Sequence, residues 1–232
     1  MTIHGPSSGS YEVARDPILM TDWSYRNSFD EWAYSLRLPK PNENVLRPAM
    51  RSILLNGKGQ YVPTMEEFQD PKFPPVKEVA KHTIVVNKGK RYLLRLINTS
   101  VDATFIFSID DHLITVVGAD FVPIRPYSTK SVLVGIGQRY HVVVEAKPSK
   151  DVPGGNYWIR TTVAKGCSSF ERTRALPDER TGILRYDFDS PFDPLSKKHE
   201  FSTDCSDEPY EKLEPIVKWM VNTDTDGTYS IP

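Results

Sequence analysis

One histidine follows two aspartates at the start of an apolar run in the segment SIDDHLITVVGADF, residues 108–121. Carboxylate and imidazole groups this close together could bind a metal ion or transfer a proton. The alternative is the ordinary entrance to a buried strand, because Asp favours turns for backbone reasons. We expect His112 to be a structural histidine, hydrogen-bonded near the end of a β-sandwich, because buried polar groups are nearly always hydrogen-bonded.

Two other short motifs match functional patterns. Residues 5–9, GPSSG, fit the pattern G-x-S-x-G, in which a preceding strand and a following helix expose a nucleophilic serine. Only four residues precede this motif and no helical periodicity follows it, so we do not expect a hydrolase that uses Ser7. Asn98-Thr99-Ser100 is a glycosylation sequon between two expected strands, and Asn98 would carry a sugar if the protein is secreted.

Length and composition restrict the class of protein. A chain of 232 residues fits one large all-β domain or two small ones. The formal net charge of -1 and the isoelectric point near 6.5 argue against a nucleic-acid partner. The longest apolar stretches, such as LITVVGA, are far shorter than the roughly 20 residues of a membrane helix, so no membrane partner is expected. The N-terminal segment MTIHGPSSGSYEVARDP has no basic region and no apolar region, so it is not a signal peptide.

Short alternating or β-branched runs predict the strands. Gly, Pro, Asn or Asp separate these runs, which is typical of a β-sandwich or barrel. We expect strands at residues 17–23, 52–56, 82–86, 91–98, 103–109, 112–117, 129–134, 138–146, 156–163 and 181–187. A short helix is expected at 28–37, after an Asn/Ser start, and proline-rich loops at 38–50 and 62–78. Alternation places Trp158 and Arg160 on one face of their strand, which we interpret as sandwich packing.

Several longer segments resemble a known family. SILLNGKGQY, VNKGKRYLLRLINTSVDATFIFSIDDHLITVVGADFVPIRPYSTKSVLVGIGQRYHVVVEA, NYWIRTT and GILRYD look like the middle plastocyanin-like domain of fungal laccase-type multicopper oxidases. The resemblance runs in order from IHGP at 3–6 to LEPIV at 213–217. It implies an all-β, cupredoxin-like Greek-key β-sandwich with long loops. It also implies a linker from a first domain at residues 1–16, the plastocyanin-like domain at 17–187, and a loop-rich tail toward a third domain at 188–232.

The copper ligands of that family have no counterpart in this sequence. A blue copper centre needs two His and one Cys, and the family's trinuclear cluster uses His-x-His pairs. The next histidine after Cys167 is His199, and no histidine follows Cys205. The histidines stand at positions 4, 82, 112, 141 and 199, and no two are separated by a single residue. We therefore expect this chain to hold no cofactor, metal ligand or catalytic residue, although copper is the cofactor of the parent family.

The resemblance implies the copper-free central domain of a laccase-like oxidase, whose reaction is one-electron oxidation of phenolic-type substrates with reduction of O2 to water. The chain is expected to be inactive alone. Its start at Met1 without a secretory signal and its end just past LEPIV suggest a fragment, a partial gene model or a truncated paralogue, although the family is secreted. The expected partners are flanking cupredoxin domains and, in the full enzyme, a phenolic small molecule. The alternative is a stand-alone, non-enzymatic β-sandwich binding module. A domain built to lie between two others should expose large apolar patches, and a self-sufficient module should have polar faces.

The resemblance also assigns expectations to single residues. In such laccases, a carboxylate at the position of Asp22, in LMTDW, faces the phenol pocket and can accept the phenolic proton. This role requires the parent's copper domain, and the alternative is an Asp that fixes the loop following its own strand. Some relatives have a disulfide between similar regions, so we expect a Cys167–Cys205 bridge rather than two thiols, with a contribution of about 4 kcal/mol. The family shows Asp-Gly-His at residues 110–112, so the turn at Asp111 should differ slightly.

Overall fold

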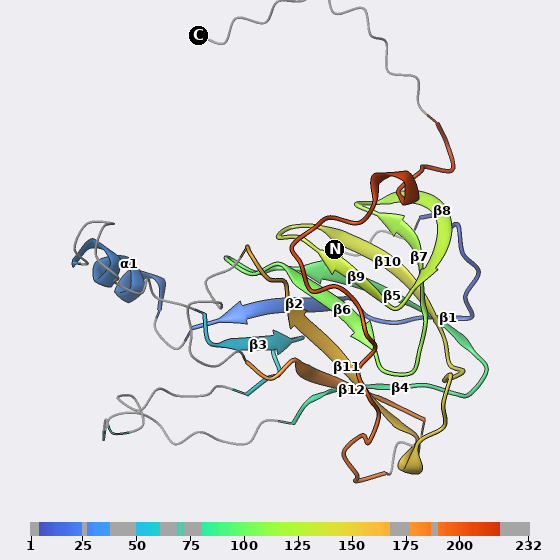
Figure 1. The fold of residues 1–232 in the computed structure, drawn as a ribbon, viewed down its shortest axis with the longest axis horizontal. Coiled ribbons are helices and arrows are strands. Elements are labelled where there is room, and N and C mark those ends of the chain that lie inside the picture. The colour runs from blue at the N-terminus through green and yellow to red at the C-terminus, as the bar shows by residue number, and fades with distance from the viewer. Residues whose placement is uncertain are drawn as a thin grey trace, which may run out of the picture.

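A computed structural model gives the fold of the chain. It describes residues 5–24, 27–37, 50–60, 69, 71, 80–167, 177–186 and 190–218. Two β-sheets face each other around the main hydrophobic core, and a long C-terminal segment crosses one of them (Figure 1). The expected all-β sandwich is therefore confirmed. Most of the two expected proline-rich loops, and the tail beyond residue 218, lie outside the described residues.

The larger sheet has seven strands, in the order β3-β2-β5-β10-β7-β8, with β1 paired to β5. These strands are β1 (Val13–Ala14), β2 (Ile18–Trp23), β3 (Ser52–Leu55), β5 (Arg91–Asn98), β7 (Ile114–Ala119), β8 (Val122–Thr129) and β10 (Arg139–Glu145). β2 and β5 pair in parallel, whereas β10 is antiparallel to β5 and β7. Parallel neighbours need a crossover connection. Here the connection from β2 to β5 includes one strand of the second sheet, which lies between β3 and β5 in the chain.

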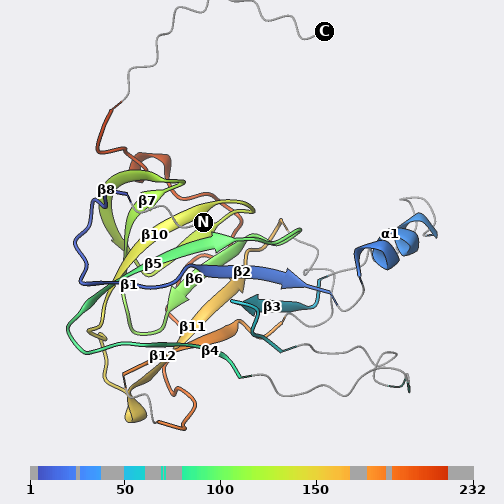
Figure 2. The same ribbon diagram turned by 180° about the vertical axis from the view of Figure 1, so that it is seen from behind.

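The smaller sheet has five strands, in the order β4-β12-β11-β6-β9 (Figure 2). These strands are β4 (His82–Val85), β6 (Phe105–Ile109), β9 (Ser131–Val134), β11 (Asn156–Val163) and β12 (Arg180–Arg185). Every residue of β6 and β11 is buried. A sandwich strand normally buries only alternate side chains, so another part of the chain must cover the outer face of these two strands.

Large apolar and aromatic side chains from both sheets fill the space between them. Those that are less than 2% exposed are Tyr92, Tyr157, Phe105, Phe107, Ile18, Met20, Leu55, Leu94, Leu96, Ile109 and Ile114. Full burial of one aliphatic or Phe side chain contributes about 1.5–3 kcal/mol relative to its exposure to water. Burial of these side chains stabilises the two sheets, and the sheets in turn hold the polar groups on their outer faces in place.

The sequence patterns missed β1 and β8. β8 contains Pro123 and Pro126, and most of its side chains are at least partly exposed. Proline is tolerated here because β8 is the outermost strand of its sheet, where a missing N–H removes no internal ladder bond. The strand expected at 129–134 is divided, because β8 ends at Thr129 and β9 begins at Ser131. The other expected strands are observed, with boundaries that shift by at most two residues.

The C-terminal strap, residues 190–218, crosses the outer face of the smaller sheet (Figure 1). Phe201 of the strap packs against a buried cluster on that face, formed by Ile106, Leu133 and Ala164. The backbone N–H of Lys165 donates to the carbonyl of Thr203, and that of Cys205 donates to the carbonyl of Lys165. The part of the expected tail that the structure describes is thus tied to the sandwich, and it includes the 3₁₀ helix η3 (Tyr210–Lys212).

The N-terminal segment covers part of the larger sheet's outer face. The hydroxyl of Ser8 donates to the carbonyl of Val117 over 2.7 Å. Gly9 lies so close to Val117 that any side chain there would collide with it, which is the close approach that glycine permits. Val117 belongs to a small buried cluster with Leu93 and Val143. The two ends of the described chain therefore each cover an outer face of the sandwich.

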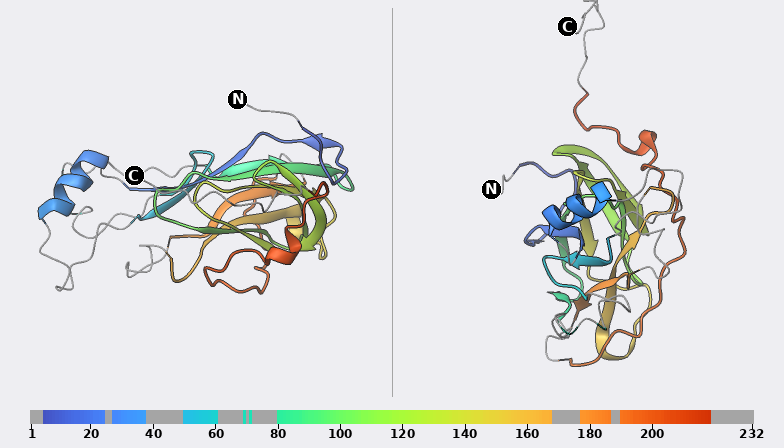
Figure 3. Two further views of the ribbon diagram at one scale, coloured as in Figure 1. Left: turned by 90° about the horizontal axis from the view of Figure 1, so that it is seen from above. Right: turned by 90° about the vertical axis from the view of Figure 1, so that its left-hand side faces the viewer.

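Helix α1 (Ser28–Arg37) forms where the sequence predicts it. The side-chain oxygen of Asn27 accepts hydrogen bonds from the backbone N–H groups of Phe29 and Asp30, both over 3.0 Å, and so caps the helix. α1 lies beyond the end of β2 and away from both sheets (Figure 3). In the part of the chain that the structure describes, no helix is long and apolar enough to span a membrane.

Candidate functional site

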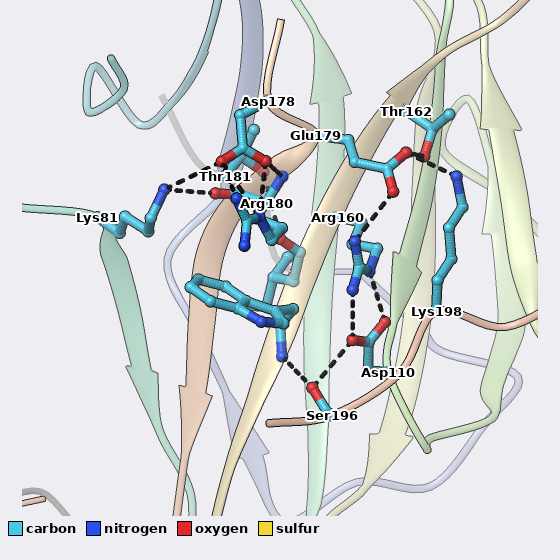
Figure 4. Close-up of polar contacts among 12 residues, drawn as sticks. Lys81, Asp110, Arg160, Thr162, Asp178, Glu179, Arg180, Thr181, Ser196 and Lys198 are labelled. Atoms are coloured by element: carbon cyan, nitrogen blue, oxygen red, sulfur yellow. Dashed lines mark hydrogen bonds and ion pairs between the residues drawn. The ribbon is translucent and has the colours of Figure 1, made fainter. Parts of the chain in front are cut away.

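A buried charge pair joins Asp110 and Arg160 beneath the strap (Figure 4). Asp110 directly follows β6 and is fully buried, and Arg160 lies on the outer face of β11 with 8% of its surface exposed. The guanidinium donates two hydrogen bonds, of 2.7 and 2.9 Å, to the two carboxylate oxygens. The hydroxyl of Ser196, on the strap, also donates to Asp110 over 2.9 Å. This bidentate arrangement fixes the position of both charged groups.

Glu179 extends this network toward the surface. Its carboxylate accepts hydrogen bonds from Arg160, over 2.9 Å, from Thr162, over 2.8 Å, and from Lys198 of the strap, over 2.6 Å. Burial raises the pKa of Glu179, but the hydrogen bonds from Lys198 and Thr162 and the charges of Lys198 and Arg160 hold it below its ordinary value. Each charge in the network is paired with an opposite charge. The network therefore holds the strap in place, and none of its groups is left unpaired to transfer a proton.

A second polar group lies beside the network and is more open to water (Figure 4). Arg180 pairs with Asp178 over 2.9 Å, and the two side chains are 50% and 35% exposed. The Arg180 guanidinium and the Lys81 ammonium lie 5.3 and 5.5 Å from the ring centre of Trp158. These contacts help to cover Trp158, which is 4% exposed, on the outer face of the sheet.

His112 is a buried, doubly hydrogen-bonded side chain, as the turn interpretation predicts. Its Nδ1 lies 2.8 Å from the carbonyl of Asp110, so Nδ1 carries the proton and donates. Its Nε2 therefore accepts from the hydroxyl of Tyr186 over 2.7 Å. Burial lowers the pKa of His112, against the opposite effects of the Asp110 carbonyl and of the charge of Asp111. Asp111 itself has φ of 56°, the left-handed conformation that glycine would adopt easily.

Asp22 is 4% exposed, and its carboxylate is directed at its own chain. Oδ1 accepts from the backbone N–H of Val101 over 2.9 Å, and Oδ2 accepts from those of Asp102 and Ala103 over 2.8 and 3.0 Å. Asp22 thus fixes a loop, as in the structural alternative, but the loop is the one between β5 and β6 rather than the one after β2. In this chain alone, the carboxylate offers no open face to a phenol.

Asn98, where the sequon would carry a sugar, is a buried side chain with a fully hydrogen-bonded amide. Asn98 is 1% exposed, and its amide donates to the carbonyls of Ala103 and Val134 over 2.9 Å each. Its side-chain oxygen accepts from the backbone N–H of Ser100 over 2.9 Å. Attachment of a sugar would replace one of these N–H groups and so break one of these two hydrogen bonds. The sequon therefore serves the fold, because it joins β5 to β9 and to the following loop.

Cys167 and Cys205 form a disulfide between the loop after β11 and the strap. Their Cα atoms are 6.0 Å apart, within the ordinary range for a disulfide. Ser7 has no nucleophilic environment, because its hydroxyl donates to the carbonyl of Gly9 two residues along the chain. The described residues 5–12 around it form neither a strand nor a helix, whereas the serine motif requires both.

The donor set does not fit a copper centre of the family's type. Both cysteine sulfurs are used in the disulfide, so no thiolate is available. Within the described ranges, no three His, Cys, Asp or Glu side chains are arranged to hold a metal ion. His4 lies outside those ranges. No reaction step is therefore assigned to copper in this chain.

Sequence patterns missed the network of Asp110, Arg160, Glu179 and Lys198, because these residues come from four separate segments. One signal was available. Arg160 stands in a strand whose other outward positions are Asn, Trp and Thr, and a buried Arg needs a carboxylate partner. The identity of that partner depends on strand order, which the pattern alone does not provide.

The chain is similar to known oxidases along most of its length. The family model described as "Multicopper oxidase" matches residues 15–187. A laccase of Arthroderma benhamiae is 50% identical over 222 residues, and Laccase-2 of Botryotinia fuckeliana is 37% identical over 215 residues. These matches cover 95% and 93% of this chain, but only 32% and 34% of the two relatives. The chain thus spans about a third of the length of the curated relatives it matches.

The fold has a solved counterpart. The crystal structure of a laccase from Botrytis aclada superposes with a TM-score of 0.75 at 37% sequence identity. The superposition covers 92% of this chain and 36% of that laccase. The match therefore concerns one β-sandwich within a larger molecule.

Proposed function

The chain belongs to the multicopper oxidase family, and we propose that it acts as a copper-free central cupredoxin domain within a longer laccase-like oxidase. The parent reaction would be one-electron oxidation of phenolic-type substrates coupled to reduction of O2 to water. The chain would contribute spacing between two copper-bearing domains and one wall of the substrate pocket. By itself it would have no oxidase activity.

The state of the cysteines carries this proposal. A blue copper centre needs a thiolate beside two imidazoles, and here the sulfurs of Cys167 and Cys205 bond to each other. His112 has both ring nitrogens engaged by the protein. The relatives are about three times as long as the region they share with this chain, which leaves room for copper-bearing domains outside it. The disulfide also supports an oxidising compartment, as expected for a secreted oxidase.

Asp22 would act on the pocket indirectly. Its carboxylate holds the loop at residues 101–103 through three backbone hydrogen bonds. Val101, at the start of that loop, is 78% exposed. We propose that Asp22 shapes this wall, and that any contact with the phenol requires the parent's copper domain.

A domain exchange tests the proposal. The matching third of the Arthroderma benhamiae laccase is replaced by this chain, and copper content and oxygen consumption with a phenol are measured. We expect the chimera to hold copper and consume oxygen, and the isolated chain to do neither. An isolated chain that consumes oxygen with a phenol would contradict the proposal. A folded chimera without copper would favour the stand-alone binding module.

A further inference from the structure

Helix α1 has an apolar face that the sandwich does not cover. Phe29, Trp32 and Leu36 recur at positions i, i+3 and i+7, so they lie on one side of the helix. Their exposed fractions are 80%, 63% and 66%. α1 makes no extensive contact with any strand, and it lies apart from the sandwich, beyond the end of β2 (Figure 3).

A helix of this kind needs a partner surface. α1 has ten residues, whereas isolated helices shorter than about 12–15 residues are marginal in water. The cap at Asn27 contributes only about 1 kcal/mol. Most helical stability in proteins comes from packing of the apolar face, and in α1 that face consists of Phe29, Trp32 and Leu36.

The same end of the molecule exposes further apolar surface. Trp23, at the end of β2, is 50% exposed, and Val101 is 78% exposed. Val101 belongs to this end because its backbone N–H donates to Asp22, the neighbour of Trp23. The outer faces of the two sheets, in contrast, are crossed by the strap and by the N-terminal segment (Figure 1).

We propose that Phe29, Trp32 and Leu36 of α1, together with Trp23 and Val101, form the docking face for a neighbouring domain of the same polypeptide. This docking proposal rests on the proposed function, in which the chain is one domain of a longer oxidase. In the relatives, about two thirds of the polypeptide lies outside the matched region. A tethered domain has an effective concentration of the order of millimolar, which favours it over a second copy of this chain.

Hydrogen–deuterium exchange of α1 tests the docking face. Amide exchange at residues 30–37 is compared between the isolated chain and the laccase chimera, each at two concentrations. In the chimera we expect exchange to be slower by roughly tenfold or more, because the helix can open only after it undocks. Equal exchange in both proteins would overturn the proposal. Slowing in the isolated chain that grows with concentration would also overturn it, in favour of a second copy.

A matched pair of variants excludes a trivial loss of the helix. The triple variant Phe29→Gln, Trp32→Gln and Leu36→Gln keeps good helix formers, and it should remove the slowing in the chimera. The control, Phe192→Gln with Leu195→Gln, changes strap residues that are 69% and 68% exposed, and it should leave the slowing intact. Slow exchange that persists in the triple variant would contradict the proposal.

Oxygen consumption separates this inference from the proposed function. An active chimera whose α1 exchanges as fast as in the isolated chain overturns the docking face alone. An inactive, copper-free chimera with a protected α1 supports the docking face and contradicts the proposed function.

Discussion

The strap and helix α1 both lie beside the sandwich, but they meet it in opposite ways. The strap is held by polar contacts, from Ser196 to Asp110 and from Lys198 to Glu179, and by the disulfide at Cys205. Among the described residues, α1 makes no extensive contact with any strand, and its large apolar side chains are exposed. The strap therefore completes this domain, whereas α1 offers a surface to another one.

The strap also protects the edge of the smaller sheet. Glu208 accepts a hydrogen bond from the backbone N–H of Leu133, in the outermost strand β9, over 3.0 Å. It also accepts from the hydroxyl of Tyr127 over 2.9 Å. Burial, followed by the charge of Glu208, raises the pKa of Tyr127. An exposed strand edge invites pairing with other chains, so the strap closes this edge, whereas the large apolar side chains of α1 stay exposed.

The largest effect is expected from Asp110→Ala. This change leaves the buried guanidinium of Arg160 without its bidentate partner, and breaking such a pair costs about 3–5 kcal/mol. Urea unfolding should report this loss. Asp178→Ala is the control, since it breaks a half-exposed pair with Arg180 that is worth about 0–1 kcal/mol. Equal losses in the two variants would contradict the view that the strap covers a buried charge network.

Removal of the disulfide should have the next largest effect. The variant with Cys167→Ser and Cys205→Ser releases a loop closed over 38 residues, and we expect a loss of about 2–4 kcal/mol in unfolding free energy. Amide exchange near residue 205 should accelerate while exchange in α1 stays the same. Acceleration in α1 of similar size would show that the two regions are not independent.

Asp22→Asn should destabilise the end of the molecule near α1 by about 1–3 kcal/mol, because an amide replaces one of the two oxygens that accept backbone N–H groups. Chemical denaturation measures this loss. Asp16→Asn, on the exposed surface, should change stability by no more than about 0.5 kcal/mol. An Asp22→Asn protein as stable as the original would remove the structural role of this carboxylate.

The free energy of unfolding should depend on pH through His112, which lies beside the strap. Burial lowers the pKa of His112 in the folded state, so the unfolded chain binds a proton more readily once the pH falls below about 6.5. The contribution of neutral His112 to the free energy of unfolding should thus be fully present above that pH. It should decline as the pH falls toward the pKa of His112 in the folded state. His112→Gln should reduce this slope in unfolding curves between pH 7.5 and 5.5. His82 and His141, whose pKa values burial also lowers, should retain part of it.

The smallest effect is expected from the α1 triple glutamine variant in the isolated chain. The three replaced side chains are 63% to 80% exposed there, so unfolding free energy should change by no more than about 0.5 kcal/mol. Differential scanning calorimetry can measure this. A loss above about 1.5 kcal/mol would mean that α1 packs on the sandwich and that the contrast with the strap is wrong.

The fold could be predicted from the sequence wherever local pattern decides it. Strands such as β5 and β11 combine β-branched or aromatic residues with clear turn signals, and α1 has its capping Asn27. β8 could not be predicted, because its prolines argue against a strand unless its place at the sheet edge is known.

Some features of the polar sites could be predicted from the sequence, and others could not. The disulfide followed from a resemblance to relatives, whereas the partners of Arg160 depend on strand order and on the course of the strap. Asn98 matched a modification motif in the sequence, yet its amide is a buried cross-link between strands. Sequence patterns do not report whether a polar side chain points inward.

Copper loading of the purified chain tests the central claim most directly. The chain is incubated with cupric salt, passed through a chelating column, and analysed for copper and for the visible absorption of a copper–thiolate bond. The account predicts no retained copper and no absorption, because the two cysteine sulfurs that could supply a thiolate are bonded to each other. One tightly held, blue copper ion per chain would contradict it.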